Sequence, residues 1–156
     1  MSERPHFESN KHGVPGLFRR LGAILYDTLL VIGLMFMAST LVIIILGIIS
    51  GLDNIDPAGL RNNPFYIAYL LSIPSLFYIC FWKLAGQTLG MRTWRLRIVD
   101  EQGGELSWRG ATLRFVAAAL SWAVLGLGYF WILIDPEKKA WHDRLSRTRL
   151  ILTSKT

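Results

Sequence analysis

Arg20 and Asp27 are the residues whose types and spacing point most directly to chemistry. They are seven positions apart, so on a helix they share one face, two turns apart. Asp27 lies about one to two turns into an apolar stretch, where an ionised carboxylate is costly unless it is paired or hydrated. The two α carbons would be about 10 Å apart. Extended side chains can shorten the distance between the two charged groups but do not always bring them into contact. We therefore predict an ionised Asp27 held by Arg20, with Lys83, Arg92 or Arg144 as alternative partners.

Two roles fit a pair of this kind. In the first, Asp27 is a titratable carboxylate in a proton or ion path, and Arg20 tunes its ionisation through the opposite charge. In the second, the two side chains form a structural ion pair that locks the first helix to its neighbours. The substitution Asp27→Asn separates them, because a transporter should lose flux while it keeps its fold.

The remaining polar residues exclude several classes of function. The sequence contains no phosphate loop and no nucleophile triad, and His142 and Asp143 stand without companion metal ligands. Thr88, between Gly86 and Gly90, is predicted to form a turn or helix cap at the membrane surface. The glycine amides there could hold an anion, although the motif is short. We therefore expect no enzyme activity, no metal, no cofactor and no nucleic-acid partner.

Three uncharged apolar runs must position these side chains. Residues 28–52, 62–82 and 115–134 contain no charged residue and are 25, 21 and 20 residues long. A bilayer core of about 30 Å needs about 20 apolar helical residues to cross it. Backbone groups in lipid must satisfy their own hydrogen bonds, so the runs must be helices. The distribution of apolar residues therefore predicts an all-α integral membrane protein, although the overall hydrophobic fraction of 52% decides little.

The placement of basic residues predicts the orientation in the membrane. Of 17 Lys and Arg residues, only Arg61 lies between the first two runs, whereas four precede the first run. Six more lie between the second and third runs, and six follow the third. By the positive-inside rule, both termini and the long middle segment are cytoplasmic. We therefore predict a polar cytoplasmic tail over residues 1–16 and a membrane domain over residues 17–153.

The third run raises a parity problem. Three full crossings that start inside would leave the basic C-terminus outside. Gly126 and Gly128 invite a break, and the arm 129–134 that follows is too short to cross alone. We therefore predict two full transmembrane helices and a third element that starts as early as Ser107, breaks near Gly126 and returns. A plain three-span protein is the alternative.

Two segments outside the apolar runs have strand character. Residues 94–99 (WRLRIV) alternate large apolar and basic side chains, and residues 100–104 are typical of a turn. Glu105 and Leu106 then continue the segment, as in the second arm of a hairpin. Residues 149–152 could form another strand and pair with 96–99, because a hairpin alone is marginal in water. We predict a small cytoplasmic hairpin or strand element, whose basic residues could also meet anionic lipid headgroups.

Three motifs, in order along the chain, resemble the RDD family of bacterial membrane proteins. Residues 20–27 (RLGAILYD) resemble the family's first-helix signature, with arginine at the helix start and aspartate inside it. Residues 86–100 (GQTLGMR, then LRIVD) are similar to its G-x-T-x-G segment and following strand. Residues 141–148 (WHDRLSRT) look like its C-terminal element.

The family takes its name from one arginine and two aspartates. Arg20 and Asp27 match the first two, and the second aspartate is best matched by Asp143, with Asp135 as the less suitable candidate. The chain departs from the usual pattern at Gly22, and also at residues 146–147, where Ser-Arg replaces the usual Ala-Gly before the threonine. This second departure bears on whether the C-terminal turn keeps its tight geometry.

The resemblance implies a multi-pass protein of the bacterial inner membrane. It also implies transport of an unidentified ligand, with cation–proton antiport in some members. We therefore expect a small transporter, oligomeric because so few helices cannot readily enclose a path alone. The alternative is a non-transporting scaffold or assembly partner, which would bind another membrane protein or anionic lipid through its basic cytoplasmic face.

Overall fold

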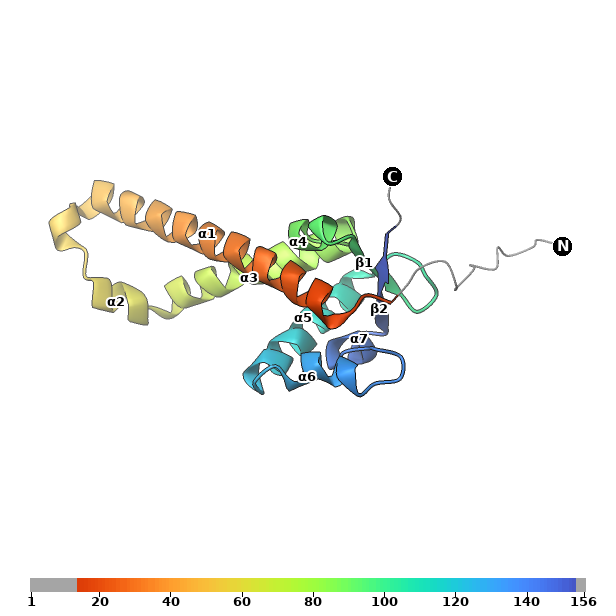
Figure 1. Ribbon diagram of the computed structural model, residues 1–156. Helices are drawn as coiled ribbons and strands as arrows, with labels where there is room; N and C mark the ends of the chain where they lie inside the picture. Colours follow the sequence, from red (N-terminus) through yellow and green to blue (C-terminus); the bar gives the residue numbers. More distant parts are fainter. Residues whose placement is uncertain (1–13, 154–156) are drawn as a thin grey trace.

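Two long helices dominate the computed structural model, which describes residues 14–153. Helix α1 (Leu17–Ser50) has 34 residues and α3 (Pro64–Leu84) has 21, and both are long and apolar enough to cross a membrane. They run side by side in opposite directions, and a short turn and α2 (Pro57–Asn62) join them at one end (Figure 1). The predicted tail over residues 1–16 lies almost entirely outside the described residues.

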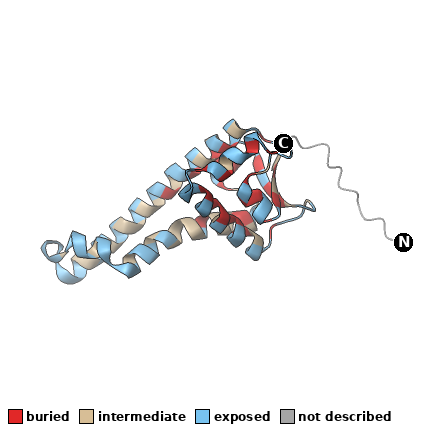
Figure 2. Ribbon diagram, turned by 90° about the horizontal axis from the view of Figure 1, so that it is seen from below, coloured by how far each residue is buried: buried red, intermediate tan, exposed pale blue. Residues whose placement is uncertain are grey.

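Apolar side chains cover the outside of this helix pair. Phe36 is 71% exposed and Ile48 is 80% exposed, and most of the surface of α1 and α3 towards α2 is likewise unburied (Figure 2). In water such a surface would be unfavourable, whereas lipid tails solvate it well. The apolar helices therefore identify a membrane protein, as the uncharged runs predict.

The third membrane element is broken, as predicted. Helix α5 (Trp108–Ala123) begins directly after its cap residue, Ser107. The chain then turns at Gly126, whose φ of 75° is in the left-handed region that glycine adopts at little cost. Helix α6 (Leu127–Phe130) and a short 3₁₀ helix (Trp131–Leu133) follow, and the axis changes direction by 107° across the break.

A two-stranded antiparallel sheet joins the middle segment to the C-terminus. Strand β1 (Leu96–Asp100) pairs with β2 (Thr148–Leu152), and Arg97 lies opposite Ile151. The predicted pairing of these segments is confirmed. The hairpin alternative is not observed, because Glu105 belongs to no strand and β1 finds its partner about fifty positions further along the chain.

Each strand follows a short helix in the same way. Helix α4 (Leu89–Thr93) precedes β1, and α7 (Trp141–Leu145) precedes β2. In each case an arginine links helix to strand with a positive φ, 57° at Arg95 and 51° at Arg147. The C-terminal turn is therefore tight even though arginine stands at this position. The chain contains a repeated unit of short helix, left-handed residue and strand.

The buried core lies at the end of the helix pair that is remote from α2 (Figure 2). There α4 packs against α1 and α5 packs against α3, and side chains of the sheet join the same apolar cluster. Its apolar centre includes Ala23, Trp82, Leu96, Ile98, Ala111 and Leu150. This packing brings the polar residues of the next section together.

Candidate functional site

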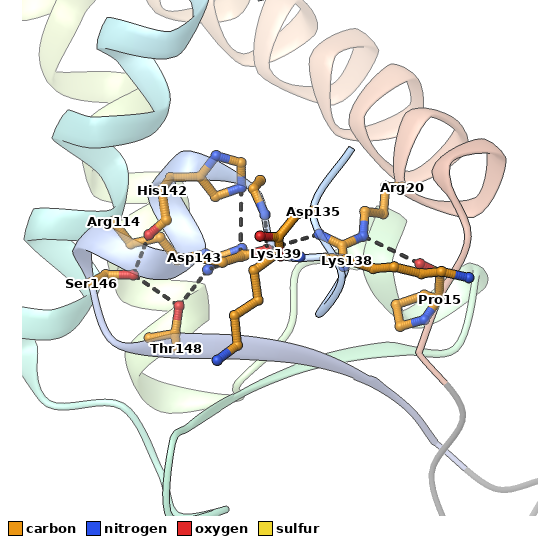
Figure 3. Close-up of polar contacts among 11 residues, drawn as sticks. Pro15, Arg20, Arg114, Asp135, Lys138, Lys139, His142, Asp143, Ser146 and Thr148 are labelled. Atoms are coloured by element: carbon orange, nitrogen blue, oxygen red, sulfur yellow. Dashed lines mark hydrogen bonds and ion pairs between the residues drawn. The ribbon is translucent and has the colours of Figure 1, made fainter. Parts of the chain in front are cut away.

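Asp143 is the centre of a buried charge cluster. Its side chain is 0% exposed, although a carboxylate is a charged group. Arg20 of α1 donates a hydrogen bond from Nη1 to Oδ2 of Asp143 at 2.8 Å, and Nη1 of Arg114 of α5 lies 2.6 Å from Oδ1 (Figure 3). One aspartate of α7 therefore holds arginines from two membrane elements.

Backbone contacts fix both ends of the Arg20–Asp143 pair. The Ala140 N–H, at the start of α7, donates to Oδ2 of Asp143 at 2.9 Å. Arg20 donates from Nη2 to the Lys138 carbonyl at 2.9 Å and from Nε to the Pro15 carbonyl at 3.4 Å. The pair therefore closes the C-terminal segment onto the first turn of α1, and its geometry is set on both sides.

Arg114 extends the cluster to the sheet and to α3. Its Nη1 donates to Oγ1 of Thr148 at the start of β2, and Oγ of Ser146 lies 2.8 Å from the same oxygen. The guanidinium also lies over the Trp82 ring, 5.3 Å from its centroid, in a cation–π arrangement. Arg114 therefore connects α5, α7, β2 and α3.

The charges of this cluster do not cancel. Burial alone would raise the pKa of Asp143, but Arg114 and Arg20 outweigh it and hold the pKa well below its usual value. Burial, with the nearby positive charge of Arg114, lowers the pKa of His142 to about 3. At neutral pH, two arginines thus face one carboxylate and a neutral imidazole, which leaves one positive charge.

Asp27 lies in a separate site. It is 3% exposed on α1, and Oδ1 accepts a hydrogen bond from the Gly90 N–H at 2.8 Å. Its Oδ2 accepts from the Thr88 hydroxyl, while the Met91 N–H donates to that hydroxyl at 3.2 Å and so completes the cap of α4. Asp27 is thus bound by the N-terminal turn of a short helix.

The predicted Arg20–Asp27 pair is wrong. Arg20 turns towards Asp143, and no basic side chain between residues 14 and 153 forms an ion pair with Asp27. Of the alternatives, Lys83 lies 3.8 Å from Glu105, and Arg144 pairs with another carboxylate. The helical spacing correctly predicted that Arg20 and Asp27 share a face of α1. Asp27 is nevertheless bound by the neutral donors at the start of α4 and not by Arg20.

The G-x-T-x-G segment owes its glycines to close packing. A Cβ on Gly90 would lie 2.4 Å from the Ala23 carbonyl oxygen and 2.8 Å from the Asp27 carboxyl. Gly86 has a φ of 69°, and its carbonyl accepts a hydrogen bond from the Ile98 N–H at 2.7 Å. The glycine amide that the sequence suggested for an anion binds an internal one, the carboxylate of Asp27.

Asp135 lies apart from both sites. It forms an ion pair with Arg144 and accepts a hydrogen bond from the Lys139 N–H at 2.8 Å. This backbone bond and the charge of Arg144 lower the pKa of Asp135 below its usual value. The Arg144 side chain is 48% exposed, so this pair closes a surface loop. Of the two candidates for the second signature aspartate, the one that contacts Arg20 is Asp143.

A cavity of about 260 Å³ lies between α1, α3 and α5 and connects the two buried sites. Its lining is largely apolar, but it includes the following side chains from both sites: Arg20, Asp27, Trp82, Arg114, Tyr129 and His142. A cavity of this size has room for a small solute or a few waters. Within residues 14–153, no three His, Cys, Asp or Glu side chains are grouped so that they could hold a metal.

The sequence did not single out Arg114 or Trp82. In the sequence, Arg114 is one of six basic residues between the second and third runs, and Trp82 is the last residue of the second run. One signal was present, because small residues at 117, 118 and 121 share a helical face with position 114. A face of one arginine and several small side chains indicates a buried charge in a closely packed interface.

Comparison with known proteins gives one family and two relatives. The sequence model described as the RDD family matches residues 14–147. The chain is 28% identical over 138 residues to the uncharacterized protein YckC of Bacillus subtilis, covering 85% of this chain and 81% of that protein. It is 31% identical over 101 residues to the uncharacterized protein RP437 of Rickettsia prowazekii, covering 64% of this chain and 56% of that one. No solved structure matches.

Proposed function

The chain belongs to the RDD family, and from this premise we propose that it is a small membrane transporter in which Asp27 carries the transported proton or cation. The observation that carries the proposal is the environment of Asp27. An ionisable side chain within a membrane helix is expensive, and most such groups serve an ion or substrate pathway. Asp27 is buried in α1, borders the cavity and has only the neutral donors of α4 within the described chain.

Neutral donors suit a group that must change its partner. A carboxylate in a buried ion pair, such as Asp143, cannot release its arginine without a large penalty. The Thr88 hydroxyl and the Gly90 N–H instead orient the Asp27 carboxylate and leave its charge uncompensated. A proton or small cation that enters the cavity can neutralise that charge. Asp143 is therefore held in place by arginines, whereas Asp27 remains free to bind a cation or a proton. This difference between the two aspartates favours transport.

Oligomerisation supports the same proposal. Two long helices and a broken third enclose a cavity but offer little protein around a continuous path. The apolar outer surfaces of α1 and α3 are available for packing against another copy or another membrane protein. We propose a homo-oligomer in which several copies surround the pathway.

Flux measurements test the role of Asp27. Purified protein in sealed vesicles should move protons in exchange for an alkali cation, detected with a pH-sensitive dye. Asp27→Asn should reduce flux to the level of empty vesicles and leave the folded protein intact, because asparagine keeps the shape and loses the charge. Asp53→Asn, at the exposed end beside α2, is the matched control and should retain flux. Equal flux in the Asp27→Asn variant would exclude this carboxylate as the carrier.

The scaffold alternative has one observation in its favour. Arg92, Arg95 and Arg97 are all exposed around β1, next to the exposed Trp94. Arginine beside tryptophan is typical of a membrane interface with anionic headgroups, at about 1 kcal/mol for each basic residue. Two results together would support a scaffold instead. The unmodified protein would show no more flux than empty vesicles, and its binding to vesicles would depend on their negative charge.

We propose that the protein lies in the bacterial inner membrane with both termini cytoplasmic. In a Cys80→Ser background, Thr153→Cys should react with a membrane-impermeant thiol reagent only after the cells are opened. Asn54→Cys, in the turn between the two long helices, should react from outside and serves as the positive control. The reason is the excess of basic residues at both ends of the chain. Labelling of Thr153→Cys from outside would show that the third element crosses the membrane fully and does not re-enter.

A further inference from the structure

Helix α4 covers Asp27. The aspartate is 3% exposed, and both of its carboxylate oxygens accept hydrogen bonds from α4, Oδ1 from the Gly90 N–H and Oδ2 from the Thr88 hydroxyl. Met91 of the same segment is 6% exposed and lines the cavity together with Asp27. A proton or cation that reaches Asp27 through the cavity therefore cannot leave on the side of α4 unless this helix moves.

The hydrogen bonds that hold α4 to α1 are the two that end on Asp27. Between residues 14 and 153, the other hydrogen bonds of α4 stay within the helix, its cap and the turn that follows it. The rest of its attachment to α1 is packing, above all the close approach of Gly90 to the Ala23 backbone. A hydrogen bond to a carboxylate is about twice as strong as a bond between neutral groups. The negative charge of Asp27 therefore contributes much of the strength of this attachment.

Neutralising Asp27 would weaken both bonds at once. A proton on Oδ1 would set an O–H against the Gly90 N–H, which can only donate. A proton on Oδ2 would have to be donated to the Thr88 oxygen, and the hydroxyl hydrogen that now binds Asp27 would lose its acceptor. A small cation bound to the carboxylate would repel the same donor hydrogens. Helix α4 is therefore held firmly by the ionised form of Asp27 and weakly by its neutralised form.

The base of the α4 segment is fixed independently of Asp27. The Ile98 N–H donates to the Gly86 carbonyl at 2.7 Å, so residues 86–98 form a loop that a backbone bond closes. Strand β1, at the end of this loop, is paired with β2. Gly86 has a φ of 69°, and glycine changes its backbone conformation at little cost, which suits a hinge. Helix α4 can therefore move away from α1 while the sheet stays in place.

The other charged and titratable groups around Asp27 would not give the same response. Those that line the cavity come from α1, α3, α5, α6 and α7, and they are Arg20, Tyr78, Arg114, Tyr129 and His142. The two arginines are paired with Asp143, and His142 is neutral, because burial and the charge of Arg114 lower its pKa to about 3. Tyrosine ordinarily titrates near pH 10, and Arg92, the charged residue of α4, is exposed. Within residues 14–153, the carboxyl group on this cavity wall is that of Asp27.

We propose that α4 is a gate, docked on α1 while Asp27 is ionised and released when Asp27 binds a proton or a cation. Met91 lines the cavity together with Leu96 and Ile98 of β1, and all three are buried, so α4 and the sheet close this side of the cavity. Release of α4 opens it. The inference rests on the proposed function, in that the cargo of Asp27 is the signal that moves the helix. It adds the step that links binding at Asp27 to opening of the pathway.

Amide hydrogen exchange of the full-length protein in detergent, followed by mass spectrometry, tests the gate without requiring flux. Exchange of the peptide that covers α4 is measured from about pH 9 to about pH 4, the range in which protein carboxyl groups titrate, and each rate is divided by the intrinsic rate at that pH. Protection of α4 should fall about tenfold towards low pH, because two charge-assisted hydrogen bonds weaken together. In the Asp27→Asn variant, protection should be low and independent of pH.

Helix α7 is the matched control within the same protein. It is also a five-residue helix before a strand, and its Asp143 is held in the ionised form by two arginines. Protection of α7 should therefore stay constant over this pH range. Thr88→Ser keeps the hydroxyl that binds Asp27 and should keep the pH response of α4, whereas Thr88→Val removes it and should lower protection at every pH.

A reversible cross-link between α4 and α1 connects the gate with flux. The Trp94 ring, directly after α4, lies against Gly22 of α1, where an added Cβ would be 2.4 Å from it. In a Cys80→Ser background, a short bifunctional thiol reagent should join Gly22→Cys to Trp94→Cys and stop flux in vesicles, and a reductant should restore it. The matched control joins Arg97→Cys to Ile151→Cys across the strand pair and should leave flux unchanged.

Three results would overturn the gate. They are protection of α4 that does not change with pH, a pH response that persists in the Asp27→Asn variant, and flux that continues after α4 has been cross-linked to α1. A loss of α4 protection that depends on Asp27, in a protein without flux, would support the release of α4 and remove the proposed transport by Asp27. Flux that depends on Asp27 with constant protection of α4 would keep transport and exclude the gate.

Discussion

Replacing Asp143 with asparagine should lower the free energy of unfolding by about 3–5 kcal/mol, which is the usual cost of breaking a buried ion pair by removing one partner. Arg20 and Arg114 would both remain buried without a counterion. The side-chain amide can also donate, so it would set an N–H against one of the two arginines. Thermal or denaturant unfolding in detergent, followed by circular dichroism, measures the loss.

The matched control is Asp135→Asn. Asp135 also pairs with an arginine and accepts a backbone hydrogen bond, but its partner Arg144 is half exposed. Water can replace the lost carboxylate there, so the loss should be much smaller than for Asp143. Equal losses for the two variants would show that the Asp143 cluster is no more important to stability than a surface pair.

Replacing Gly90 with alanine should cost about 1–3 kcal/mol through overpacking, with the upper part of that range expected. The added Cβ would lie 2.4 Å from a backbone oxygen of α1, at Ala23, which cannot rotate away. Helix α4 would have to move, and the Gly90 N–H would then lose Asp27. Unfolding in detergent measures stability, and the flux assay should show a parallel loss.

Gly33→Ala is the control for this substitution. Gly33 lies within α1, and a Cβ built on it meets nothing within 4 Å. Alanine is the better helix former by about 1 kcal/mol, so this variant should be neutral or slightly stabilising. A Gly90→Ala variant as stable as the unmodified protein would contradict the close approach of α4 and α1.

The membrane elements could be predicted because their signals are local. The length of an uncharged run, the glycine at 126 and the position of Ser107 each act within a few residues. The pairing of β1 with β2 could also be predicted, because neither strand is stable alone and both have an apolar face. Periodicity and lipid solvation together determine these features without reference to the rest of the chain.

The site was harder to predict because its partners are distant in sequence. Arg20 and Asp143 are 123 positions apart, and α7, which carries the aspartate, follows the broken element in the chain and contacts α1 only through the tertiary fold. Spacing along α1 could place Arg20 and Asp27 on one face, but it could not show which other element would face each of them. The resemblance of Asp143 to the second signature aspartate identified the residue, although not its contact with Arg20.

Arg114 was overlooked for a related reason. A basic residue at the edge of an apolar run has two interpretations, an orientation signal in the cytoplasm and a buried charge with a partner. Hydropathy does not distinguish them. The distinction depends on the buried aspartate of α7 and on Trp82 of α3, both of which only the folded chain brings near.

The different roles of the two aspartates are tested most directly by two double-mutant cycles on unfolding in detergent. Arg20→Ala combined with Asp143→Asn should cost less than the sum of the single losses, by up to about 3 kcal/mol, because the two groups are in contact. Arg20→Ala combined with Asp27→Asn should be additive within about 0.5 kcal/mol. Strong coupling between Arg20 and Asp27, with additivity between Arg20 and Asp143, would contradict the fixed role of Asp143 and the availability of Asp27.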